Sequence, residues 1–119
     1  MHSSGKAYIT RSAVFLPNAP VENDHIENVL GMIAGKPSRA RRIVLRNNGI
    51  RQRYYAIDPN TGATTHNNAQ LTAEAVRGLH ISGEIDCLVT GTTIPDQLMP
   101  NHGVMVHGEL GIPACEVIS

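Results

Sequence analysis

The sequence predicts an α/β fold built on parallel strands, and three segments near its end carry the prediction. The short apolar run IDCLVTGTT at 85–93 is followed by a turn, as expected for a strand buried on both faces of a parallel sheet. A helical segment at about 101–110 comes next, and the apolar run ACEVIS at 114–119 follows it. A strand, a helix and a strand in this order form a crossover unit, which joins parallel strands.

The composition is consistent with packed layers of sheet and helix. The chain has 119 residues, of which 41% are hydrophobic, but it contains one Phe, three Tyr and no Trp. Because aromatic side chains are scarce, any core has to be built from Ile, Val, Leu, Met and Ala.

The first third of the chain predicts a strand and a helix. KAYITRSAVFLP favours a strand at 7–16, which ends at Pro17 because proline cannot donate to a ladder. In ENDHIENVLGMIAGK the apolar residues recur with helical spacing. Asn23 or Asp24 can cap the N-terminus of this helix, which should end near Gly35 and Lys36. The apolar positions of this helix are Ile26, Val29, Leu30 and Ile33.

The middle of the chain predicts an extended piece, a loop and a helix. GIRQRYYAI at 49–57 has the composition of an extended segment, and DPNTG at 58–62 concentrates turn-forming residues. From Asn67 to Leu79 the apolar positions again share one helical face. The elements together leave an apolar edge open at 114–119, so we expect 1–119 to be the opening part of a larger domain and not an independent folding unit.

The charges are balanced overall but locally concentrated. The formal net charge is zero, so nothing in the total favours nucleic acid or an anionic membrane. Seven of the ten basic residues nevertheless fall within 36–53, which could be a solvated face, a nucleic-acid patch or a surface for an acidic partner. Only Tyr54 and Tyr55 could stack on bases there, so the nucleic-acid reading is not favoured. The seven are Lys36, Arg39, Arg41, Arg42, Arg46, Arg51 and Arg53.

The cysteines and histidines predict neither a disulfide framework nor a metal site. Cys87 and Cys115 lie in apolar runs without metal or redox spacing, which favours a reduced compartment. His102 and His107 would point about 140° apart on a helix, so we expect them on the helix surface or at an interface and expect no metal. No run has the length of a signal peptide or a membrane span, and these features together predict a cytoplasmic protein without membrane association.

Four segments in order resemble a known family. GIRQRYYA, the helix NNAQLTAEAVRGL, the strand IDCLVTGTT and the run PDQLMPNHGVMVHGELGIPACEVIS resemble the N-terminal part of β-ketoacyl-acyl-carrier-protein synthase III, of the thiolase superfamily. The family pattern has a GIRxR turn, an IDxxxxxT strand, a helix that ends in LG and a strand that leads to the nucleophile. No one of these motifs is specific alone.

The resemblance implies a fold and a reaction. The fold would be the layered αβαβα arrangement of the thiolase superfamily, here an incomplete N-terminal half of a homodimer. The reaction would be a decarboxylative Claisen condensation of an acyl thioester with malonyl-acyl carrier protein. Substrates would be carried on phosphopantetheine of acyl carrier protein, or on coenzyme A, without a further cofactor. The nucleophilic Cys would lie shortly after Ser119, so no catalytic residue is expected within the chain and Cys115 is read as a core residue.

The resemblance also implies substrate-binding residues. Arg46, Asn47, Asn48 and Arg51 would surround the mouth of the substrate tunnel, where the basic segment would meet acidic carrier protein. Ile43, Asn47 and Asn48 stand where relatives that use acyl-coenzyme A have Trp and an Arg-Thr pair, which favours delivery on carrier protein and a specialised pathway. Met99 would reach into the acyl pocket of the neighbouring subunit, although local packing of this loop residue is an equal alternative.

Two alternatives to a ketosynthase remain open at this point. One is a relative in the superfamily that only transfers an acyl group. The other is a non-catalytic chain that binds acyl carrier protein or completes a heterodimer with a second chain or the remainder of the polypeptide. A nucleophilic cysteine at the end of the last strand would separate the enzymes from the non-catalytic chain.

Overall fold

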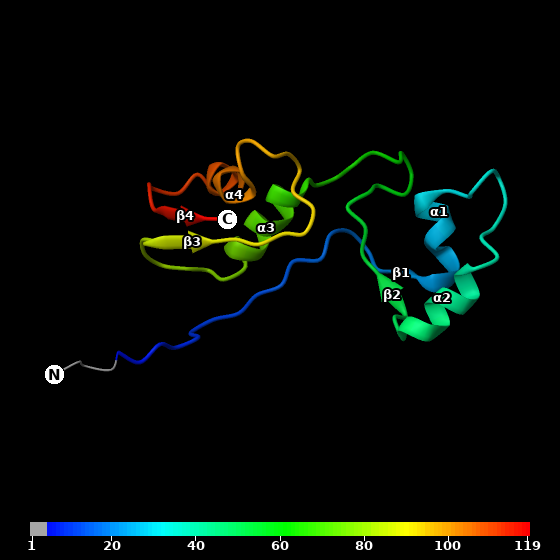
Figure 1. Ribbon diagram of the computed structural model, residues 1–119, viewed down its shortest axis with the longest axis horizontal. Helices are drawn as coiled ribbons and strands as arrows, with labels where there is room; N and C mark the ends of the chain where they lie inside the picture. Colours follow the sequence, from blue (N-terminus) through cyan, green and yellow to red (C-terminus); the bar gives the residue numbers. More distant parts are fainter. Residues whose placement is uncertain (1–4) are drawn as a thin grey trace.

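Two groups of short elements, joined by extended connections, make up the molecule (Figure 1). The computed structural model describes residues 5–119. One group holds β1, α1, α2 and β2, and the other holds α3, β3, α4 and β4 (Figure 1). In chain order the elements are β1 (Val21–Glu22), a 3-10 turn (Asn23–His25), α1 (Ile26–Leu30), α2 (Arg41–Asn48), β2 (Gln52–Arg53), α3 (Asn68–Arg77), β3 (Cys87–Val89), α4 (His102–Leu110) and β4 (Glu116–Ile118).

The parallel strand pair predicted from the sequence is present. β3 and β4 pair in parallel, with Cys87 opposite Glu116 and Val89 opposite Ile118, and α4 lies between them in the chain. The α/β class with a parallel pair is therefore confirmed, although both strands are shorter than the predicted 85–93 and 114–119.

Burial of β3 on both faces is not observed. Leu88 is 7% exposed, whereas Val89 is 68% exposed and Cys87 is also exposed. Because successive side chains of a strand point to opposite faces, these values describe a sheet with one covered face. The helices cover the face of Leu88, and no segment within 5–119 covers the other.

A small core sits between the strand pair and the two longer helices. Ala69 and Ala73 of α3, Leu88 of β3 and Val106 of α4 are its buried apolar residues. α4 approaches β4 closely at Gly103, since a Cβ placed there would lie 2.8 Å from Cγ1 of Val117. This close approach requires glycine.

Side-chain caps fix where α3 and α4 begin. Asn67 and Gln70 form a reciprocal capping box at the start of α3. The Asp96 carboxylate accepts from the N–H groups of Asn68 at 2.9 Å and Ala69 at 3.0 Å. Asn101 caps α4 by accepting from Val104 N–H at 3.0 Å. The helices predicted at 67–79 and 101–110 are thereby confirmed.

The N-terminal segment does not form the strand predicted at 7–16. The described part of the chain before β1 is extended but joins no ladder. Arg11 instead donates to the carbonyls of Leu79 and His80, just after α3. The prediction is wrong because strand propensity yields a strand only where a neighbouring strand supplies hydrogen bonds.

The first helix is shorter than predicted, and a second helix lies inside the basic segment. α1 ends at Leu30, because Gly31 takes a positive φ of 79°. α2 follows in a stretch for which the sequence predicted only a cluster of charge. The extended segment expected at 49–57 contains only the two residues of β2, which pair antiparallel with β1.

The molecule is elongated and exposes much apolar surface. Its radius of gyration is 18.7 Å, against about 13 Å for a compact domain of this length. Its accessible surface is 9339 Å², against roughly 6,300 Å² for a folded monomer of this mass. Within 5–119 no helix is long and apolar enough to cross a bilayer. That 1–119 does not fold independently stays a prediction.

The contact at Gly103 can be tested with a matched pair of substitutions on α4. We expect Gly103→Ala to lower the free energy of unfolding of the complete protein by about 1–3 kcal/mol, because the added methyl group overlaps Val117. Gly108→Ala meets nothing within 4 Å and should stabilise the helix by up to about 1 kcal/mol. Denaturant unfolding measures both, and equal effects of the two variants would contradict the close approach.

Candidate functional site

The basic helix α2 presents two different faces. Its outer face borders a shallow hollow of 630 Å³, and its inner face borders a hollow of 460 Å³ between α1, α2 and the segment around Tyr55. The outer hollow is lined by Arg39, Arg42, Ile43, Arg46 and Asn47. Arg46 and Asn47, two of the predicted substrate-binding residues, therefore lie on one surface.

The outer hollow carries uncompensated positive charge. Within residues 5–119 no carboxylate forms an ion pair with Arg39, Arg42 or Arg46. We call these three residues the arginine face. Ile43 lies among them and is 67% exposed. An anionic partner would find three guanidinium groups there and one exposed aliphatic side chain.

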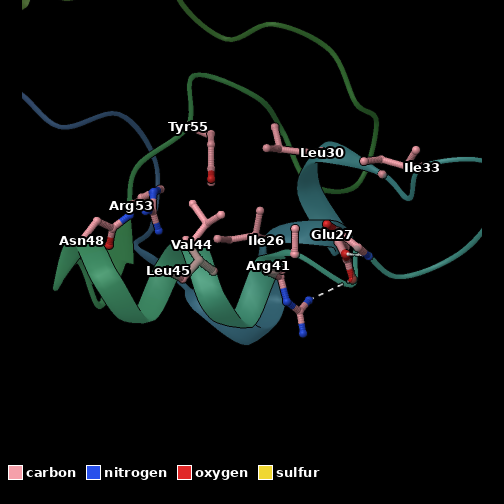
Figure 2. A pocket seen from close by; sticks show the side chains of 13 residues that line it. Ile26, Glu27, Leu30, Ile33, Arg41, Val44, Leu45, Asn48, Arg53 and Tyr55 are labelled. Atoms are coloured by element: carbon pink, nitrogen blue, oxygen red, sulfur yellow. Dashed lines mark hydrogen bonds and ion pairs between the residues drawn. The ribbon is translucent and has the colours of Figure 1, made fainter.

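The inner hollow is mainly apolar and has one ion pair at its edge (Figure 2). Figure 2 shows Val44 and Leu45 of α2 facing Ile26 of α1, with Leu30, Ile33 and Tyr55 around them. Asn48, predicted to bind substrate, lines this inner hollow and not the outer one. Asn47 and Asn48 therefore border different hollows on opposite sides of α2, and the substrate-binding role of both stays a prediction.

Glu27 links α1 to the start of α2 beside the inner hollow, and only its position in the first turn of a helix could have indicated this role from the sequence. One carboxylate oxygen accepts from the N–H of Ser38 at 2.7 Å, and the other accepts from the Arg41 guanidinium at 2.8 Å. The side chains of Glu27 and Arg41 are 13% and 23% exposed. This pair fixes the start of α2 relative to α1.

Asn23 holds the GIR turn against β1. Its side-chain amide donates to the Ile50 carbonyl at 2.7 Å, and its oxygen accepts from Arg53 at 2.7 Å. The prediction that Asn23 or Asp24 caps the first helix is wrong, because neither side chain makes a capping hydrogen bond there. The tertiary contact with the turn uses the Asn23 side chain instead.

Arg51 and Met99 lie apart from the arginine face. Arg51 lines a separate hollow of 340 Å³ with Glu22 and Asp24, and it forms no ion pair with either. Met99 is 84% exposed, precedes a cis peptide bond to Pro100, and belongs to the loop before α4 in the other group of elements. The structure thus brings Arg46 and Asn47 together but not the whole predicted set.

The burial of His102 was not predicted from the sequence. His102 is 3% exposed, so the helix surface, one of the two positions predicted for it, is wrong. It is the first residue of α4, and that end of the helix faces the core. Cys115 is half-buried and packs against the core, whereas Cys87 is exposed. The part of the chain that the structure describes contains no group of three potential metal ligands.

Comparisons with known proteins give consistent results. No protein-family model matches the chain. The chain is 26% identical to β-ketoacyl-[acyl-carrier-protein] synthase III of Koribacter versatilis over 113 residues, which cover 95% of this chain and 32% of that relative. The synthase III of Xanthomonas oryzae is 26% identical over 107 residues, covering 90% and 30%. The solved structure of AbyA1, a tetronic acid condensing enzyme, superposes with a TM-score of 0.65 at 29% identity, covering 90% of this chain and 33% of that one.

The chain is synthase III-like. The similarity extends over nine-tenths of its residues or more, in two curated relatives and one solved structure. The resemblance read from the sequence motifs is thereby confirmed. The synthase III-like chain spans about a third of the length of the curated relatives it matches.

The role of Glu27 can be tested against a neighbouring carboxylate. We expect Glu27→Ala to lower the free energy of unfolding by about 1–3 kcal/mol, because it leaves Ser38 N–H and Arg41 without their partner in a partly buried place. Asp24→Ala removes only a contact of 3.9 Å from a side chain that is 90% exposed and should have little effect. Hydrogen exchange at the Ser38 amide should accelerate in the first variant alone.

Proposed function

We propose that this chain is the N-terminal part of a ketosynthase that condenses an acyl thioester with malonyl-acyl carrier protein. The observation that carries the proposal is the similarity to synthase III and to a further condensing enzyme over at least 90% of the chain. The layered αβαβα fold belongs to the same proposal. The uncovered face of β3 and β4 supports it, because a further layer would bury Val89 and Ile118.

The proposed chemistry places the acyl group on a cysteine thiolate. The thiolate would attack the acyl thioester and release the carrier thiol; loss of CO2 from the malonyl group would then give a carbanion that attacks the enzyme-bound acyl carbon and frees the thiolate. We expect this cysteine beyond Ser119, at the end of the strand begun by β4, with the His and Asn that stabilise the developing charge supplied outside this chain.

The arginine face supports carrier protein as the donor of the acyl group. Ile43 cannot stack on adenine as an indole does, and Asn47 brings no charge to a nucleotide phosphate. Three arginines that form no ion pair within residues 5–119 suit an acidic protein and the phosphate of its phosphopantetheine arm. Ile43 and Asn47, in place of the residues that relatives use to bind acyl-coenzyme A, suit a condensing enzyme of a specialised pathway. The similarity to a tetronic acid condensing enzyme supports this assignment to a specialised pathway.

The reaction can be tested on the complete enzyme with an acylated carrier protein and malonyl-carrier protein labelled in its free carboxyl group. A ketosynthase releases labelled CO2 in step with β-ketoacyl product. Acyl transfer without CO2 would instead identify an acyltransferase, and carrier-protein binding without acylation of the enzyme would identify a non-catalytic partner chain.

Charge reversal tests whether carrier protein docks on the basic segment, at Arg46 of the arginine face and at Arg51 outside it. We expect Arg46→Glu and Arg51→Glu to raise the KM for carrier-protein substrates by about 3- to 10-fold each, with little change for small thioesters such as acyl-pantetheine. Lys6→Glu makes the same charge change at an exposed position in the N-terminal segment and should leave both values unaltered. An equal loss with both kinds of substrate would point to a structural role for the two arginines.

Met99 tests the proposed contribution of one subunit to the acyl pocket of the other. Its side chain is 84% exposed and is free to enter a neighbouring subunit. We expect Met99→Ala to shift preference toward longer or branched acyl groups by about 1–3 kcal/mol, and Met99→Trp to exclude them. Leu98→Ala, at an adjacent residue that is 87% exposed, is the matched control. Unchanged acyl-chain profiles in an intact dimer would contradict this role.

A further inference from the structure

The junction between α2 and the GIR turn holds an asparagine followed by a glycine. Asn48 is the last residue of α2, and Gly49 follows it with a φ of 67°. Both residues are exposed, and no other asparagine in the sequence is followed by glycine. Glycine has no Cβ to shield its backbone nitrogen. The side-chain amide of Asn48 therefore has an accessible nucleophile beside it that the other asparagines lack.

The N–H of Gly49 is held less firmly than the corresponding groups of the other helices. Gly31, Gly78 and Gly111 follow α1, α3 and α4, and their N–H groups donate back to those helices at 3.0, 3.0 and 3.1 Å. Gly49 makes no such bond of ordinary geometry within residues 5–119. Its nitrogen can therefore react without the loss of a well-formed helix hydrogen bond.

The side-chain carbonyl of Asn48 already accepts a hydrogen bond. Ile50 N–H donates to its Oδ1 at 2.9 Å, which closes a ring that includes the backbone of Gly49. This donor lies on the oxygen that becomes negative when a nucleophile adds to Cγ. The surroundings favour the same negative charge, because residues 36–53 contain seven basic residues and no acidic one.

We propose that Asn48 is a site of spontaneous deamidation. The Gly49 nitrogen loses its proton to solvent and bonds to Cγ of Asn48, and the side-chain nitrogen leaves as ammonia, which gives a succinimide. Water then opens the ring at either carbonyl. Cleavage beside Cγ yields aspartate, and cleavage beside the backbone carbon yields isoaspartate. The chain takes up water and releases ammonia, and no oxidant or further reactant is needed.

The modification changes both the charge and the main chain at this junction. A carboxylate at position 48 lies at the same end of the inner hollow as Arg53 (Figure 2). It competes with Asn23, whose Oδ1 accepts from Arg53 at 2.7 Å in the unmodified chain. Isoaspartate also adds a methylene group to the main chain between α2 and β2. The inference follows from the chemistry of this pair and does not depend on the proposed condensation.

Incubation of the complete protein at neutral pH, followed by digestion with trypsin, tests the proposal. Cleavage after Arg46 and Arg51 releases the peptide NNGIR, which contains both Asn47 and Asn48. Chromatography separates its aspartate and isoaspartate forms, fragment-ion mass spectra assign the modified residue, and a sample taken before incubation corrects for change during digestion. We expect modification at Asn48 and not at Asn47, which is the internal control because no glycine follows it.

A synthetic peptide of residues 44–53 gives the reference rate. We expect the rate at Asn48 in the complete protein to lie within about tenfold of the rate in this peptide, which is about 1.4 kcal/mol in activation free energy. A rate in the complete protein below this range would show that the fold protects Asn48 and would overturn the proposal.

Three variants complete the test. Gly49→Ala should leave most of the chain unmodified over the same period, because the added Cβ shields the attacking nitrogen. Gly62→Ala, at a glycine with a similar φ of 71° outside the junction, should not change the rate. If Gly49→Ala does not fold, Asn48→Gln serves in its place, because the longer side chain would have to close a larger ring and should stay intact. Equal rates at Asn47 and Asn48, equal rates in the two glycine variants, or modification of Asn48→Gln at the unaltered rate would contradict the proposal.

Discussion

The close approach of α4 to β4 at Gly103 is the contact on which the C-terminal group of elements depends. With no side chain at this position, the helix lies directly on Val117 and beside Thr90 and Ser119. α3 then packs against α4, and Arg77 links the two helices by bonding Glu74 and the carbonyl of Glu109. The small core forms only because these surfaces come this near.

The same arrangement explains why so much apolar surface stays exposed. Both longer helices lie on one side of a two-stranded sheet, so Val89 and Ile118 on the other side meet no partner in residues 5–119. Ile9 and Val14 of the extended N-terminal segment are likewise 95% and 77% exposed. Burial of apolar area is the main favourable term in folding, so these surfaces gain most from contact with further polypeptide.

The N-terminal group of elements is held mainly by polar ties. Asn23 joins the GIR turn to β1, and Glu27 joins α1 to the start of α2. These ties orient α2 so that one face borders an apolar hollow while the arginine face turns outward. The arginines of the basic segment form one surface only because α2 is oriented in this way. Arg46 and Asn47 border the outer hollow, whereas Asn48 borders the inner one.

The sequence by itself determined the local elements that carry their own signals. Asn67 and Asn101 cap the helices expected after them, Gly111 ends the second one, and the apolar runs on either side of α4 become a parallel pair. Helical period, caps and glycine act over a few residues, so they can be read without knowing the fold. The motifs read in the same way led to the synthase III resemblance.

Only the tertiary structure decided which surfaces are buried and which residues meet. The segment at 7–16 has the composition of a strand but finds no ladder, and His102, expected on the helix surface or at an interface, is buried at the start of α4. Arg51 and Met99 lie away from the arginine face that Arg46 and Asn47 share. Burial and proximity are set by contacts between residues distant in the chain, and no local pattern encodes which partner a strand edge or helix end will meet.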